Sequence, residues 1–256
     1  PASAPCTANG LGRMTKTALI VGAGDYIGAA IAKRFARGGY HVVVGRRNAD
    51  KNEPLLNAIR AEGGTASGYA FDARDEDIVK SRFAEIIAEH GVPDVVIFNV
   101  GGNVRFNLGD TTARVYRKVW EMCAFAAFLV GREAAEHMTP RGHGSIFFTG
   151  ATASMRGAAG YAAFSGGKFA LRALAQSMAR ELGPKGLHIA HLIIDAGVDT
   201  AFVRDRIKQA GVDPETMPPD TLMNPDSVGE AYWMLHHQTR DAWTHEMDIR
   251  PFGEKW

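Results

Sequence analysis

The chain has 256 residues, of which 46% are hydrophobic, and its 29 lysine and arginine residues nearly balance 28 aspartate and glutamate residues. This length and composition predict one large α/β domain, and a net charge of +1 without a long basic run indicates neither a nucleic-acid nor an anionic-membrane partner. No apolar run approaches the roughly 20 residues that a membrane-spanning helix needs.

The N-terminal segment differs in character from the rest of the chain. Residues 1–13 lack the charged start and the apolar centre of a signal peptide, and we interpret them as a flexible extension that precedes a folded domain of residues 14–256. Of the two cysteines, Cys6 lies in this extension and Cys123 in a predicted helix. We therefore expect no structural disulfide and a cytoplasmic location.

From residue 15 onward, short runs of β-branched and aromatic residues alternate with stretches of helical spacing. The runs predict strands at 18–21, 42–44, 95–98, 146–148, 189–194 and 243–249. Their near-continuous apolar character is typical of parallel strands that helices cover on both faces. One helix is predicted to end before Gly183-Pro184, and another to begin at Asn224-Pro225. The repeated units predict a single-domain, Rossmann-like, doubly wound parallel sheet of about seven strands.

A glycine-rich turn follows the first predicted strand. It spans Val21–Gly28, with the sequence VGAGDYIG, and leads into an amphipathic helical run. In this position a turn presents unpaired amides and the positive end of a helix dipole to a pyrophosphate. The alternative is a turn that only packs the helix against the strand.

The end of the second predicted strand bears on the choice of nucleotide. A site that prefers NAD places a carboxylate there, whereas this chain has Gly45 followed by Arg46 and Arg47. Two guanidinium groups suit a 2′-phosphate, although they are also compatible with a solvated helix entrance, and Asp25 would repel a phosphate that it faced. We expect NADP as the preferred cofactor, with NAD as the alternative.

A second motif, YAAFSGGK, spans Tyr161–Lys168 after the fifth predicted strand. With the glycine turn, it resembles the short-chain dehydrogenase/reductase family, whose signature is Tyr-x-x-x-Lys on a helix and Thr-Gly-x-x-x-Gly-x-Gly after the first strand. Gly22 and Gly28 match the first and last glycines of that turn, and Tyr26 replaces the middle one. The resemblance, which covers nearly the whole chain, implies an NAD(P)-dependent oxidoreductase that acts on a small molecule as a homodimer or homotetramer.

The resemblance also assigns cofactor contacts outside the first turn. Asp72-Ala73 matches an adenine-contacting pair, the segment from Asn99 matches the loop after the fourth strand, and the segment around Gly197 matches a clamp on the nicotinamide carboxamide. Residues 201–223 would form a substrate lid. The expected cofactor-binding residues are Gly22, Gly24, Tyr26, Ile27, Gly28, Arg46, Arg47, Asp72, Ala73, Asn99, Gly101, Lys168, Gly197 and Thr200.

The catalytic positions depart from the family pattern. The family uses a tyrosine as proton donor, a lysine that lowers the pKa of the tyrosine and holds the ribose, a serine that holds the substrate oxygen and an asparagine that orders water. Lys168 matches the lysine, but Phe164 stands at the tyrosine position, Ala151 at the serine position and Cys123 at the asparagine position. A phenyl ring has no proton to donate to a developing alkoxide.

Two nearby hydroxyl groups are candidate replacements. Tyr161 precedes Phe164 by about one turn, and Ser154 follows Ala151 by the same interval; the alternative is that Tyr161 lines the pocket and Ser154 caps a loop or a helix. Three functions stay open: an oxidoreductase with an altered proton relay, a catalytically silent nucleotide-binding or interaction protein, and non-redox chemistry in a repurposed pocket. The nine histidines show no metal-ligand spacing, so no metal site is expected.

Overall fold

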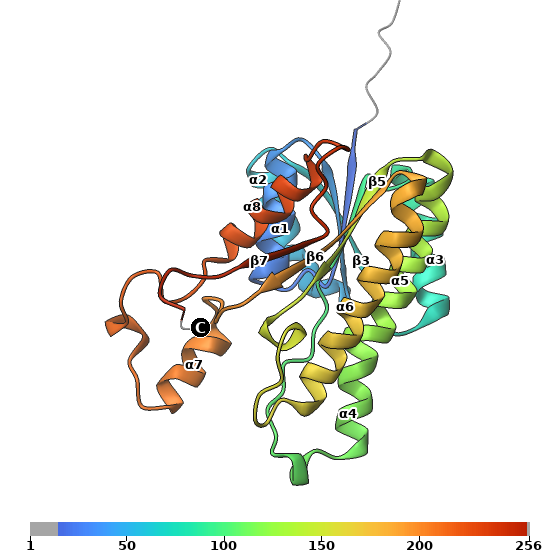
Figure 1. Cartoon of the computed structure of the whole chain (residues 1–256). Coiled ribbons are helices and arrows are strands. Elements are labelled where there is room, and N and C mark those ends of the chain that lie inside the picture. The colour runs from blue at the N-terminus through green and yellow to red at the C-terminus, as the bar shows by residue number, and fades with distance from the viewer. Residues whose placement is uncertain (1–14, 255–256) are drawn as a thin grey trace, which may run out of the picture.

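The computed structural model describes residues 15–254, so the extension proposed for residues 1–13 lies outside the described residues. Seven parallel strands form one sheet in the order β3-β2-β1-β4-β5-β6-β7, which confirms the predicted fold class (Figure 1). The strands are β1 Thr17–Val21, β2 His41–Arg46, β3 Thr65–Ala70, β4 Val95–Phe98, β5 Gly144–Thr149, β6 Leu187–Ile194 and β7 Glu246–Ile249.

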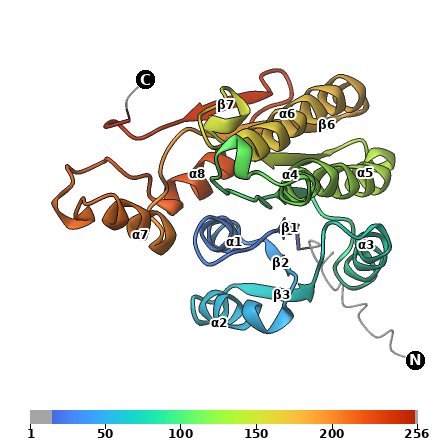
Figure 2. The same ribbon diagram turned by 90° about the horizontal axis from the view of Figure 1, so that it is seen from below.

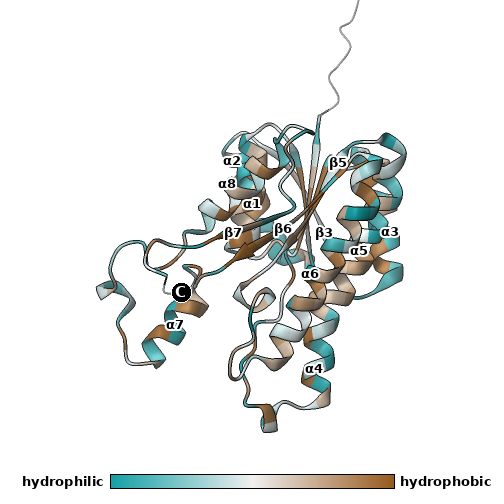
Figure 3. Ribbon diagram, viewed as in Figure 1, coloured by the Kyte–Doolittle hydropathy of each residue, from teal (hydrophilic) through white to brown (hydrophobic). Residues whose placement is uncertain are grey.

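Helices cover both faces of the sheet. They are α1 Ile27–Arg37, α2 Glu53–Ala61, α3 Glu76–His90, α4 Ala113–Trp120, α5 Ala126–Met138, α6 Ala162–Leu182, α7 Ala201–Gln209 and α8 Pro225–His236. Figure 1 shows α1, α2 and α8 on one side of the sheet and α3, α5 and α6 on the other, and each group encloses its own hydrophobic core. Figure 3 shows the expected pattern, with hydrophobic strands at the centre and hydrophilic surfaces outward.

The two edges of the sheet account for the differences from the predicted strands. Edge strand β3 was absent from the six predicted strands because only Ala66 of its six residues is buried, so it has no apolar run. The strand predicted at 243–249 begins at Glu246 instead. The side-chain oxygen of Gln238 accepts the amide of Thr244 at 2.8 Å, which holds the preceding residues outside the sheet.

The predicted helix boundaries are confirmed. Helix α6 ends at Leu182, and a 3₁₀ turn begins at Gly183. Asn224 caps α8 through a 2.9 Å hydrogen bond from the amide of Asp226, and Pro225 is the first helical residue. Within residues 15–254, no helix is both long enough and apolar enough to cross a bilayer.

The topology determines where a ligand site forms. Strands β1 and β4 are neighbours, so the winding of the chain reverses direction between them. In parallel sheets of this kind, ligands bind outside the carboxyl ends of the strands at such a switch point. Figure 2 views the molecule from the end at which the loops after β4 and β5 and helix α7 gather.

Candidate cofactor-binding and catalytic site

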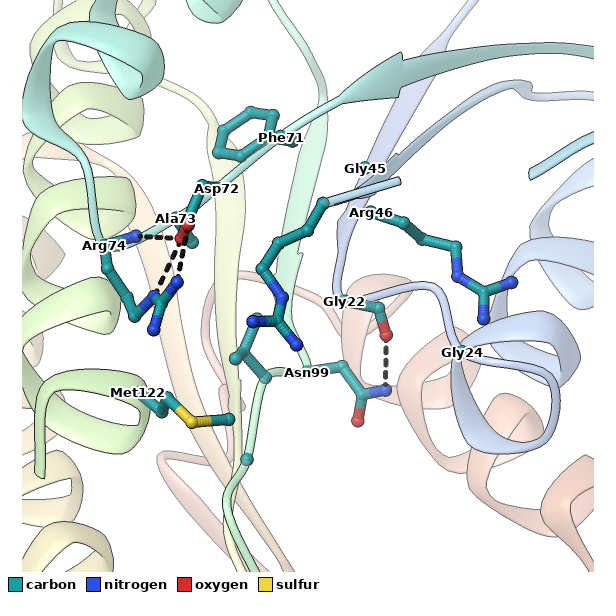
Figure 4. Close-up of a pocket in the computed structure, with 13 residues that line it drawn as sticks. Gly22, Gly24, Gly45, Arg46, Phe71, Asp72, Ala73, Arg74, Asn99 and Met122 are labelled. Atoms are coloured by element: carbon teal, nitrogen blue, oxygen red, sulfur yellow. Dashed lines mark hydrogen bonds and ion pairs between the residues drawn. The ribbon is translucent and has the colours of Figure 1, made fainter. Parts of the chain in front are cut away.

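A pocket of about 260 Å³ opens at the carboxyl ends of β1, β2, β3 and β4 (Figure 4). It is lined by Gly22, Gly24, Gly45, Arg46, Arg47, Phe71, Asp72, Ala73, Arg74, Asn99, Val100, Gly101 and Met122. The pocket therefore brings together predicted residues from four separate loops. Tyr26, Ile27, Gly28, Lys168, Gly197 and Thr200, which were also predicted, do not line it.

Close packing explains Gly22 but not Gly24 in the first turn. Gly22 has φ +91°, and a Cβ atom there would lie 2.7 Å from the carbonyl oxygen of Asn99. The side chain of Asn99 in turn donates a 3.0 Å hydrogen bond to the carbonyl oxygen of Gly22. A Cβ atom on Gly24, by contrast, would meet nothing within 4 Å. The turn is thus tightly packed at Gly22 and open to the pocket at Gly24.

The first turn of α1 keeps amide groups available. No side chain caps this helix, and the amides of Ala29 and Ala30 are satisfied by the carbonyl oxygens of Gly24 and Tyr26. The first helical amides have no partner within a helix, so those at the start of α1 can serve an anion. This geometry is the one that a pyrophosphate site requires.

The side chain of Tyr26 contacts helix α7 and does not line the pocket. Its hydroxyl accepts a 3.0 Å hydrogen bond from the amide of Ala201, the first residue of α7. The hydroxyl of Thr200 caps the same helix by accepting the amide of Val203. Tyr26 therefore holds the start of α7, which is also the start of the predicted lid, close to the glycine turn.

The two arginines after β2 have different surroundings. Nη1 of Arg46 lies 2.8 Å from the carboxylate of Asp25 and also donates to the carbonyl oxygen of Lys51 (Figure 4 shows Arg46 extending toward the turn of Gly24). The charge of Asp25 is thereby neutralised. Arg47 is exposed and lines the pocket, and it forms no ion pair with any residue that the structure describes.

Sequence reasoning missed Arg74 and Met122 as lining residues. Nε and Nη2 of Arg74 bond the two carboxylate oxygens of Asp72 at 2.9 and 2.6 Å, as Figure 4 shows. These hydrogen bonds hold the pKa of Asp72 below its usual value. An aspartate after a strand was a usable signal for the turn at Arg74, because aspartate side chains commonly accept the backbone amide two residues on, as Asp72 accepts the amide of Arg74 at 3.1 Å. Nothing in the sequence marked Met122.

Lys168 is buried on α6, beside the loop that follows β4. Its Nζ donates a 2.7 Å hydrogen bond to the carbonyl oxygen of Thr149, and a Cβ atom on Gly101 would lie 3.8 Å from it. Only 3% of Lys168 is exposed, and this burial lowers the pKa of the ammonium group. Gly101 lines the pocket, so Lys168 lies directly behind this part of the pocket wall.

The three residues expected at the family's catalytic positions lie together. Phe164, 8% exposed, packs with Cys123 and Ala151 in a small hydrophobic cluster that is separate from the two main cores. Cys123 belongs to a π-helical turn, Glu121–Phe125, that joins α4 to α5. Nζ of Lys168 is 5.8 Å from the centre of the Phe164 ring. The cluster buries these apolar groups against one another.

Neither candidate replacement points its hydroxyl freely into this cluster. Ser154 is fully buried, and its Oγ accepts the amide of Ala151 at 3.1 Å, so it caps the turn after β5. Helix α6 begins at Ala162, which makes Tyr161 the N-cap residue and not part of a shared helical face with Phe164. The hydroxyl of Tyr161 accepts a 2.6 Å hydrogen bond from Nη2 of Arg206 on α7.

Comparison with known proteins places this geometry in a family. The family described as short chain dehydrogenase matches residues 16–211. Gluconate 5-dehydrogenase of Gluconobacter oxydans is 34% identical over 172 residues, which are 67% of each chain. A solved short-chain dehydrogenase from Rhodopseudomonas palustris is 49% identical, with a TM-score of 0.78 over 93% of this chain and 99% of that one. A metagenomic short-chain oxidoreductase solved with NADP has a TM-score of 0.79 over 92% of this chain and 97% of its own, at 23% identity, and so supports the fold alone. The chain belongs to the short-chain dehydrogenase family.

Proposed function

We propose that this protein is an NADP(H)-binding oxidoreductase whose proton relay differs from the usual relay of its family. The cofactor assignment rests on the residues at the end of β2. The position where an NAD-selecting site has a carboxylate is occupied by Gly45, whose Cβ atom would lie 3.0 Å from Cβ of Phe71, while Arg47 is free of ion pairs in the part of the chain that the structure describes. A 2′-phosphate is the group that this arrangement suits.

The remaining residues fit a dinucleotide. The uncapped start of α1 and the open space at Gly24 suit a pyrophosphate, and Phe71 and Ala73 form an apolar wall for an adenine. The solved metagenomic relative holds NADP on the same fold. When bound, the nicotinamide supplies hydride chemistry.

Within this proposal, Lys168 holds the cofactor instead of tuning a tyrosine. Its ammonium group is fixed by the carbonyl oxygen of Thr149 and lies next to Gly101, which lines the pocket. Phe164 belongs to the small hydrophobic cluster described above and transfers no proton. The proton of the reduced product therefore comes from water or from the substrate.

One observation favours a second candidate, a catalytically silent nucleotide-binding protein. Phe164, Ala151 and Cys123 pack against one another, so the place of the family's proton relay is filled with carbon and sulfur. The names of the curated relatives range from gluconate 5-dehydrogenase to versicolorin reductase and do not agree on a substrate. Substrate turnover separates the two candidates.

Cofactor binding is tested by thermal unfolding with NADPH and NADH. A ligand at a hundred times its Kd stabilises the folded state by about 2.7 kcal/mol, so NADPH should raise the melting temperature more than NADH at equal concentration. Arg47→Ala should remove this difference. Arg37→Ala, which removes an exposed arginine paired with Glu62 outside the pocket, is the matched control. Equal stabilisation by the two cofactors in the unmodified protein would contradict the assignment.

We also propose a homo-oligomer with twofold symmetry. Four large aromatic side chains are exposed on the helices α4, α5 and α6, namely Tyr116, Trp120, Phe128 and Phe169. Exposed aromatic groups that gather on neighbouring elements are typical of subunit contacts. Helices that pair across a twofold axis would bury them.

A further inference from the structure

Tyr161 lies between two guanidinium groups, one from a helix and one from a loop. Nη2 of Arg206, on α7, donates to the hydroxyl of Tyr161 at 2.6 Å, and Cζ of Arg105, in the loop after β4, lies 5.9 Å from the centre of the tyrosine ring. Neither arginine has a carboxylate within ion-pair distance among residues 15–254. Two cations therefore approach one phenol without a counter-charge.

Three segments that follow adjacent strands create this arrangement. The loops after β4 and β5 are joined by a 2.9 Å hydrogen bond from the amide of Phe106 to the carbonyl oxygen of Gly160, and a Cβ atom on Gly160 would lie 3.0 Å from Cγ of Arg105. Helix α7 follows β6. Figure 1 shows α7 beyond the same end of the sheet as these two loops. The guanidinium groups thus lie at the carboxyl ends of the strands, where the cofactor pocket also opens.

One buried carboxylate at this end of the sheet is already paired. Asp195, at the end of β6, is 2% exposed and accepts a hydrogen bond from the hydroxyl of Thr152. Its oxygens also lie 3.4 Å from Arg156 and 3.5 Å from Arg250. Asp195 therefore neutralises other cations and leaves Arg105 and Arg206 uncompensated.

The hydroxyl of Tyr161 adds a third donor. It accepts from Arg206, and within the described part of the chain no acceptor faces its own hydrogen. A phenol both accepts and donates, and a guanidinium has five N–H donors, so this group has unused donors and no unused acceptor. Such a set of donors matches an anionic oxygen group such as a carboxylate or a phosphate.

Exposed apolar side chains lie on the same three segments as the donors. Phe202, on which the guanidinium of Arg206 lies, is 55% exposed, and Phe106 and Met155 from the two loops are 43% and 39% exposed. Tyr161 itself packs against the cluster of Phe164. A ligand that reaches the donors therefore also meets apolar surface.

We propose that Arg105, Tyr161 and Arg206 bind the anionic oxygen group of the substrate, and that the apolar part of the same substrate packs against Phe164 and Phe202. This inference rests on the proposed function, because it assigns a substrate class to that site: carbonyl compounds that carry a carboxylate or a phosphate on an apolar body.

Calorimetric titration of the full chain, with and without saturating NADP⁺, tests the assignment. The probes are benzoylformate, its neutral methyl ester and phenylphosphonate. Benzoylformate or phenylphosphonate should bind at least about tenfold more tightly than the ester, because a hydrogen bond to a charged group is worth about this factor. The tighter of the two anions identifies the oxygen group.

Arg105→Ala and Arg206→Ala should each weaken anion binding about tenfold and leave ester binding unchanged, because only the anion uses the charge. Arg206→Lys should restore part of the affinity, which would separate loss of charge from loss of folding. Arg180→Ala is the matched control, since Arg180 is exposed on α6 and, within the described residues, bonds only the carbonyl oxygen of Gln176.

Anion and ester binding with equal affinity, or arginine variants without effect, would overturn the proposal. NADP⁺ that binds while both anions fail would refute this inference alone, and anions that bind while NADP⁺ fails would refute the proposed function alone.

Discussion

Restoring the two missing hydroxyl groups should create ketone reductase activity. The change is Phe164→Tyr together with Ala151→Ser, at the positions that the family resemblance assigns to the proton donor and to the oxygen-holding serine. General acid catalysis contributes about 10²–10⁴ in rate, so the double variant should reduce simple ketones about that much faster than the unmodified chain. The single Phe164→Tyr variant should recover part of this gain.

The structure supports the expected gain in rate and indicates that the variant loses stability. Nζ of Lys168 is 5.8 Å from the centre of the Phe164 ring, so an ammonium group is already near enough to favour the phenolate form of a tyrosine there. Phe164 is 8% exposed, and a buried hydroxyl without a partner costs about 1–3 kcal/mol. We therefore expect a faster but less stable enzyme.

The assay is the consumption of NADPH, followed by absorbance, with a panel of simple ketones at saturating cofactor. Adding Lys168→Met to the double variant should abolish the gain, which controls for nonspecific opening of the site. A folded double variant that binds NADPH and shows no gain would refute the assignment of residues 151 and 164. Strong activity in the unmodified chain that Tyr161→Phe abolishes would instead identify Tyr161 as the proton donor.

Three further outcomes are expected. Gly22→Ala should lower the free energy of unfolding by more than about 1 kcal/mol in urea, because its Cβ would meet Asn99 at 2.7 Å in a left-handed conformation, whereas Gly24→Ala has open space and should be nearly neutral. Trp120→Lys should shift the light-scattering mass toward the monomer, and a monomeric unmodified chain at micromolar concentration would contradict the oligomer. Burial lowers the pKa of His236 to about 3. As the pH falls below about 6.5, His236 is therefore protonated in the unfolded chain but stays neutral in the folded chain. His236 alone should therefore contribute a decline in stability of about 1.4 kcal/mol per pH unit between about pH 6.5 and pH 3, and His236→Gln should reduce the measured slope by that amount; an unchanged slope would show that other groups, such as His191, cause the decline.

Much of the fold and part of the site followed from local patterns in the sequence. Apolar runs marked the buried strands because both faces of a parallel sheet exclude water, and proline after Asn224 marked the start of α8 because proline suits the first helical position. The glycine turn could also be predicted from the sequence, because a strand, a glycine cluster and a helix in that order have few possible geometries. Edge strand β3 could not be predicted from the sequence, because most of its residues are not buried and they form no apolar run.

The tertiary structure decided the partners of the charged and hydroxyl groups. The sequence contained Asp25 and Arg46 as opposing influences on a phosphate, and the structure pairs them with each other. Tyr26 was expected at the cofactor and binds the start of α7, and Tyr161 was expected on a helical face and accepts a hydrogen bond from Arg206. The partners of these tyrosines are 175 and 45 residues away in the chain, so no local spacing encodes them. Strand order brings the segments to one end of the sheet, and side-chain packing there selects which donor meets which acceptor.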